Sequence, residues 1–222
     1  MSAYFFSFPL QASLQQTIDN LLADHARGQY ADSSTSVQLA IGTNDGIIQA
    51  LALDVVEILK NGGESAGILD VLAKLLKTTM HGLIKGIMGK LEKGEQDKLA
   101  GYLSRRRVVV AGQTRFGFGM PEAAGARFEA IINRIGGGDT GPEARQELTA
   151  LMGEFVDIAM VHFYDEFTGS LDLGFVKRKL VDVGRSTLVK GSHSATSKLF
   201  VKMTDEDLKR VTAHYGLMFV KA

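Results

Sequence analysis

The chain has 222 residues and a mass of 24.0 kDa, the size of one ordinary domain or at most two small ones. Lysine plus arginine and aspartate plus glutamate each number 25, so the formal net charge is zero and a globally basic nucleic-acid-binding protein is disfavoured. Cysteine is absent, which excludes disulfides, thiolate zinc sites, iron–sulfur clusters and cysteine nucleophiles.

The chain begins with a short aromatic segment followed by helical periodicity. Residues 3–8 are predicted to form an edge strand or an arm that docks on the core, and Pro9 ends this segment. Ser13 and Gln16 make a capping box at the start of a helix, and Gly28 is a suitable residue to end it.

A loop and two helices are expected next. Residues 28–46 are polar and rich in turn-forming residues, so we interpret them as a loop around a short apolar stretch. Asn44 or Asp45 would then cap a helix over 47–60. A long amphipathic helix is predicted over 65–93.

The pattern changes from helix to strand after a short helix at 95–105. Residues 107–119 hold two β-branched or aromatic runs on either side of Ala111-Gly112-Gln113, which predicts a β-hairpin. The elements expected after the hairpin are a helix over 121–136, a helix over 142–167, a helix over 173–183, a loop or short strand over 186–197, a strand over 198–203 and a helix over 204–215.

These elements predict a mainly α fold, a multi-helix bundle-like single domain over 1–222 with a small antiparallel β-hairpin or sheet. An α+β fold is the second choice. The triple glycine near 136–141 is the one candidate hinge.

Several large enzyme classes lack their motifs here. The chain has no Walker loop, no complete G-x-G-x-x-G and no H-E-x-x-H, and we expect no cofactor and no metal. The N-terminus does not resemble a secretory signal, and no run of 18 uncharged apolar residues is present. We therefore expect a cytoplasmic protein.

The first candidate for function is the cationic side of the long helix. Lys74, Lys77, Lys85 and Lys90 form an interaction face opposite an apolar arc that includes Leu72, Leu76, Leu83 and Ile87. Such a helix binds a partner groove or an anionic membrane surface, but an ordinary core helix with a solvated lysine side gives the same pattern. On the core-helix interpretation, the four apolar residues are buried.

The second candidate is a polar pair in an apolar arc. His162 and Glu166 are four residues apart on the helix predicted over 142–167, on the side that carries Phe155 and Ala159. The pair could act as catalytic acid and base, or as two metal ligands that need a third. A simple ion pair, or the emergence of the helix end into solvent, is the alternative.

The third candidate follows from charge segregation. Residues 121–172 are strongly acidic and residues 173–203 strongly basic, so the two segments either neutralise each other or leave a basic site free. In the second case Arg185, Lys190 and His193 are the candidate anion-binding residues of a polar loop.

The leading hypothesis is a non-catalytic helical protein that binds a protein partner or self-associates. The alternatives are an enzyme or ligand-binding domain that uses the His162–Glu166 pair and the basic segment, and a peripheral membrane protein that uses the lysine face. No nucleic-acid partner is expected.

Overall fold

The computed structural model describes residues 4–59, 63–89 and 91–221, and it confirms a mainly helical fold with a small antiparallel sheet. The helices, with η for a π-helical turn, are α1 (Ala12–Ala26), α2 (Ser33–Ile48), η1 (Gln49–Leu53), α3 (Asp54–Ile58), α4 (Glu64–Ile87), α5 (Lys93–Arg105), α6 (Glu122–Gly136), α7 (Pro142–Ala159), η2 (Met160–Asp165), α8 (Glu166–Gly169), α9 (Phe175–Leu199) and α10 (Asp205–Gly216). The strands are β1 (Tyr4–Phe8), β2 (Arg107–Val110), β3 (Gln113–Gly119) and β4 (Phe219–Lys221).

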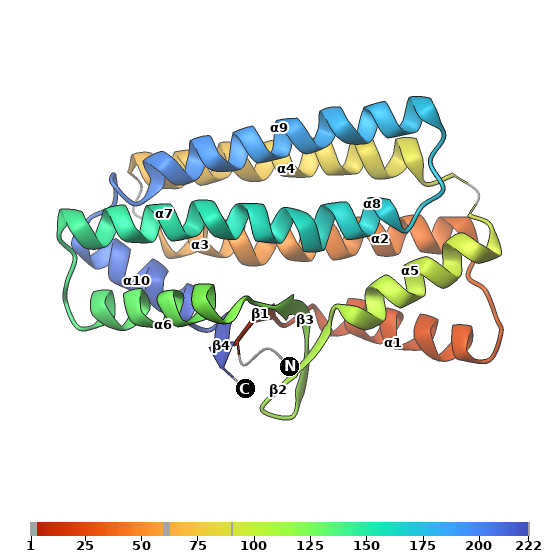
Figure 1. Ribbon diagram of the computed structural model, residues 1–222, viewed down its shortest axis with the longest axis horizontal. Helices are drawn as coiled ribbons and strands as arrows, with labels where there is room; N and C mark the ends of the chain where they lie inside the picture. The colour runs from red at the N-terminus through yellow and green to blue at the C-terminus, as the bar shows by residue number, and fades with distance from the viewer. Residues whose placement is uncertain (1–3, 60–62, 90, 222) are drawn as a thin grey trace.

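The helices lie in three tiers along the long axis of the molecule (Figure 1). Helices α4 and α9 form one outer tier and pack side by side. The middle tier contains α2, η1 and α3 in one row and α7, η2 and α8 in another. The remaining tier contains α6, α10, the sheet, α1 and α5. Helix α6 packs against α7, and residues 136–141, the candidate hinge, join them.

The sheet has the strand order β2-β3-β1-β4, so β1 is an inner strand. The expectation of an edge strand at 3–8 was wrong, because the strand that follows α10 pairs with its free side: Phe6 lies opposite Phe118 on β3 and opposite Phe219 on β4. The predicted hairpin is confirmed. Its turn places Ala111 and Gly112 at φ 50° and 78°, as a two-residue type I′ connection requires.

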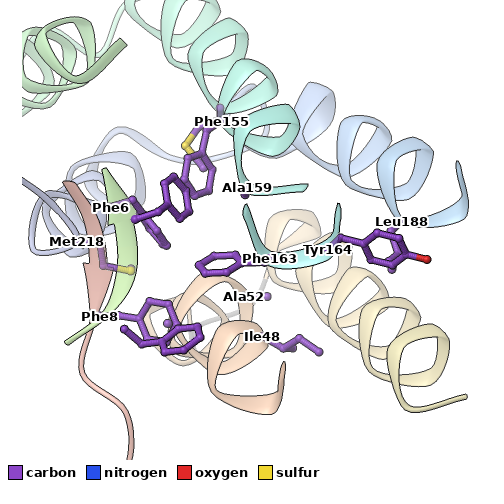
Figure 2. Close-up of a cluster of buried hydrophobic side chains, with 14 of the residues drawn as sticks. Phe6, Phe8, Ile48, Ala52, Phe155, Ala159, Phe163, Tyr164, Leu188 and Met218 are labelled. Atoms are coloured by element: carbon purple, nitrogen blue, oxygen red, sulfur yellow. The ribbon is translucent and has the colours of Figure 1, made fainter. Parts of the chain in front are cut away.

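Aromatic side chains join the sheet to the middle tier. The Phe6 ring lies 4.6 Å from that of Phe155 on α7, and the Phe118 ring lies 5.1 Å from that of Phe163 on η2. Figure 2 shows this cluster between β1 and the middle-tier helices. Phe6 and Phe118 are almost fully buried, so the cluster fixes the sheet against the helices.

The loop expected over 28–46 is instead mostly helix α2. Asp32 caps this helix, because its carboxylate accepts a hydrogen bond from the Thr35 amide (2.9 Å). Asn44 and Asp45 lie inside α2 and cap nothing. The end expected at 61–63 falls largely outside the described residues, and no capping box forms at Ser13, because α1 already begins at Ala12.

The loop expected over 186–197 and the strand over 198–203 were also wrong, because α9 continues to Leu199. Its small residues serve close packing: a Cβ at Gly184 would lie 2.8 Å from the Tyr164 hydroxyl oxygen, and one at Gly191 would overlap Leu75 on α4. The small residues of this segment therefore let neighbouring helices approach closely. Their low helix propensity was the reason for predicting a loop here.

The long helix α4 ends at Ile87, six residues before the predicted end. Leu83 and Ile87 are buried, as expected. Leu72 and Leu76 are only half-buried and pack at the margin of the core.

Candidate functional site

The predicted His162–Glu166 pair exists and is half-buried. His162 Nδ1 lies 2.7 Å from Glu166 Oε1, and the imidazole stacks on the Phe118 ring at 4.4 Å. The other oxygen of Glu166 accepts a hydrogen bond from Arg106 Nη2 (3.2 Å). The cation that holds this carboxylate is therefore a buried arginine that directly follows the short helix predicted over 95–105.

This cluster does not have the shape of a metal site. No group of three or more histidine, aspartate or glutamate side chains that could hold a metal occurs among the described residues. Burial lowers the pKa of the Arg106 guanidinium, and the charge of Glu166 opposes that shift. Arg106 Nε and Nη1 have no hydrogen-bond partner in the described part of the chain.

The three candidate anion-binding residues lie on α9, and two of them pair with carboxylates on the middle tier. Arg185 donates to both Asp165 oxygens (2.7 and 2.8 Å), and this hydrogen bonding raises the pKa of Arg185. His193 Nε2 lies 2.9 Å from Asp157 Oδ1. Lys190 is exposed. The acidic and basic segments thus neutralise each other at these two positions.

The predicted lysine face is only partly free. Lys74 binds Asp70 on the same helix (2.7 Å), and Lys77 lies 3.7 Å from Asp45 on α2. Lys85 is exposed, and Lys90 lies outside the described residues.

An apolar cavity of about 130 Å³, partly open to solvent, lies inside the helical layers. Helix α4 packs against α2 and α9, and α9 packs against α7, but α2 and α7 make few close backbone contacts. The cavity occupies this loosely packed space. Its lining comes from α2 and η1 (Leu39, Ala40, Thr43, Asn44, Ile47, Ile48, Leu51), α4 (Leu76, Met80, Ile84), α5 (Leu99, Tyr102, Leu103), α7 to α8 (Phe155, Val156, Ala159, Met160, Phe163, Tyr164, Phe167) and α9 (Leu188, Ser192).

Both π-helical turns contribute to the cavity wall. Leu51 belongs to η1, and Met160, Phe163 and Tyr164 belong to η2. Figure 2 shows Phe163 directed toward the sheet and Tyr164 directed toward Leu188. A π-turn is wider than an α-helical turn, so consecutive side chains can pack against different parts of the protein. Such turns are frequent at functional sites.

Two polar side chains in this apolar wall lack partners. Thr43 Oγ1 and Asn44 Nδ2 are buried and form no hydrogen bond with the described residues. Tyr102 also lines the cavity, and burial raises the pKa of its hydroxyl. Buried polar groups are normally satisfied, so these atoms are positions where a ligand could bind.

Sequence reasoning missed this site. One signal was available: Thr43 and Asn44 interrupt an apolar series that includes Leu39, Ile47 and Ile48 at helical spacing. His162 does not line the cavity, although its neighbours Phe163 and Tyr164 do.

Comparison with known proteins found no matching family model, no matching curated protein and no matching solved structure. Among the described residues, one continuous helix, Ser33–Ile58, is long and apolar enough to cross a membrane by length and composition alone. Its Leu39, Ile48 and Val55 side chains are buried in the protein core.

Proposed function

We propose that this protein binds a small apolar molecule that carries one hydrogen-bonding group. The observation that carries the proposal is the unpaired Thr43 hydroxyl and Asn44 amide in the wall of an otherwise apolar cavity, as found within the described residues. A buried polar group without a partner destabilises the free protein, and a ligand that satisfies it recovers that free energy on binding.

The size of the cavity limits the buried part of the ligand. Apolar cavities of roughly 150 Å³ take up benzene or xenon. A cavity of about 130 Å³ therefore suits a body close to one aromatic ring or a short alkyl chain. The hydroxyl of Thr43 both donates and accepts, so an alcohol, phenol or carbonyl group suits the polar end.

Phenol and benzene are the matched probes for this proposal. We expect phenol to raise the melting temperature by mass action and to bind more tightly than benzene. Thr43→Val should weaken phenol binding about fivefold, the equivalent of one hydrogen bond, and leave benzene binding unchanged. Thr212→Val is the control, because Thr212 is also buried with a hydroxyl unpaired in the described chain but does not line the cavity. Equal effects of the two variants on phenol binding would contradict the proposal.

A second pair of variants tests the cavity itself. Ala159→Leu adds bulk inside the cavity and should abolish the binding of both probes with little change in stability. Ala144 is fully buried outside the lining, so Ala144→Leu should destabilise the fold by about 1–3 kcal/mol through overpacking. If Ala159→Leu binds the probes normally, the cavity is not the binding site.

A further inference from the structure

The first two turns of α9 carry an unusual run of exposed side chains. Every residue from 174 to 180 is exposed, although the segment from Phe175 onward is regular helix. Phe175 and Val176 are 73% and 79% exposed, the most exposed large apolar side chains among those described. Two such neighbours on a folded helix are unusual, because apolar helical residues normally face a core.

Helix α4 holds this end of α9 in place. Lys177 Nζ donates to the Ile87 carbonyl oxygen at the end of α4 (2.9 Å). Leu180 lies over Gly86, where even an added Cβ would come within 3.2 Å of its side chain. The protein therefore presents Phe175 and Val176 on a supported helix.

The exposed apolar residues are surrounded by cations. Arg178 and Lys179 form no ion pair with the described residues, and Lys179 Nζ lies 4.5 Å from the centre of the Phe175 ring. Lys85 on α4, next to Gly86, is also exposed without an ion pair in the described chain. The neighbouring acids are few: Asp172 pairs with Lys98 (2.8 Å), which leaves Asp182 as the exposed carboxylate on these turns.

Exposed apolar and cationic side chains also occur further along the outer side of α9. Val183 and Lys190 follow Val176 at intervals of seven residues, which places all three on one side of the helix. Val183 is 65% exposed, and Lys190 is exposed without an ion pair to any residue that the structure describes. Apolar and cationic side chains thus share the surface of α9 that faces away from the core.

We propose that this surface, Phe175–Leu180 together with Lys85, Val183 and Lys190, docks on an anionic phospholipid membrane. The cations match the charge of the lipid headgroups, and Phe175 and Val176 would enter the boundary between headgroups and acyl chains. The proposed membrane-binding surface therefore lies mainly at the start of α9 and not on the lysine face predicted on α4. The cations at the start of α9 form no ion pair with the described residues.

Tryptophan fluorescence tests the proposal directly, because the chain contains no tryptophan. Phe175→Trp is the reporter, and Val109→Trp, at a similarly exposed position on strand β2, is its control. We expect the emission of the Phe175→Trp variant to shift to the blue with vesicles of phosphatidylcholine and phosphatidylserine, to remain unshifted with phosphatidylcholine alone, and to return to its original position in high salt. The control reporter should not respond.

Flotation with the same vesicles measures the role of charge. The triple variant Lys85→Gln, Arg178→Gln, Lys179→Gln should bind about a hundredfold more weakly. The triple variant Lys198→Gln, Lys202→Gln, Lys209→Gln removes three cations elsewhere and should weaken binding less than about fivefold. Equal losses in the two variants, or equal binding to neutral vesicles, would overturn the proposal. A concentration-dependent blue shift without lipid would overturn it in favour of self-association.

Discussion

Three buried tyrosines make the stability of this fold sensitive to alkali. Burial raises the pKa of Tyr102, Tyr164 and Tyr215, that of Tyr164 to about 12. In the unfolded chain each phenol ionises near its ordinary pKa of about 10. Above that pH the unfolded chain has released protons that the folded chain still binds, so the free energy of unfolding falls as pH rises.

The expected magnitude follows from the number of groups. Each tyrosine contributes a slope of about 1.4 kcal/mol per pH unit, so three contribute about 4 kcal/mol per unit between about pH 10 and 12. The total stability of a domain is about 5–15 kcal/mol. A loss of this size should therefore unfold the protein within this pH window. Urea unfolding followed by circular dichroism from about pH 8 to 12, with tyrosinate absorbance recorded in parallel, measures the slope.

Two variants separate ionisation from hydrogen bonding. Tyr102→Phe and Tyr164→Phe should each reduce the alkaline slope by about 1.4 kcal/mol per pH unit. At neutral pH only Tyr164→Phe should destabilise the fold, by about 1 kcal/mol, because its hydroxyl donates to the Val181 carbonyl oxygen (2.6 Å). An unchanged alkaline slope in both variants would refute the reasoning.

The remaining predictions concern packing and the histidines. Gly117→Ala should destabilise the fold by about 4 kcal/mol or prevent folding, because its Cβ would overlap strand β1; expression and urea unfolding test this. Leu83→Ala should cost about 2–5 kcal/mol, and Leu76→Ala clearly less, because only Leu83 is fully buried; paired urea titrations compare them. His162→Ala should destabilise more than His193→Ala, by about 1 kcal/mol, because His162 stacks on an aromatic ring; equal melting temperatures would contradict this.

Sequence reasoning succeeded where local signals and tertiary packing agree. Ala111-Gly112 determines a hairpin, and the helix predicted over 204–215 forms as α10, where Thr204 accepts a hydrogen bond from the Asp207 amide (3.1 Å). It failed for α2 and α9, where serine, threonine and glycine indicated loops. At Gly184 and Gly191 the physical reason is that helix–helix contact, and not the local chain, selects a small residue.

The second reason for error is a change in which side of the helix near His162 is buried. A continuous α-helical pattern from 142 to 167 places His162 and Glu166 in the apolar arc. The π-turn η2 adds an extra residue to the turn, so the buried side passes to Phe163, Tyr164 and Phe167. Thr43 and Asn44 were the one sequence signal for the cavity, but its volume and lining depend on the spacing of helices, which only the complete fold determines.

The inner position of β1 affects the order in which the chain can fold during synthesis. Its partner β3 follows about a hundred residues later, and β4 more than two hundred residues later. Until both have left the ribosome, Phe6 and Phe8 have no sheet to complete and remain available for mispairing or chaperone binding. Loss of the strand Phe219–Lys221 would leave the finished protein with an open strand edge beside an aromatic core, a surface suited to aggregation.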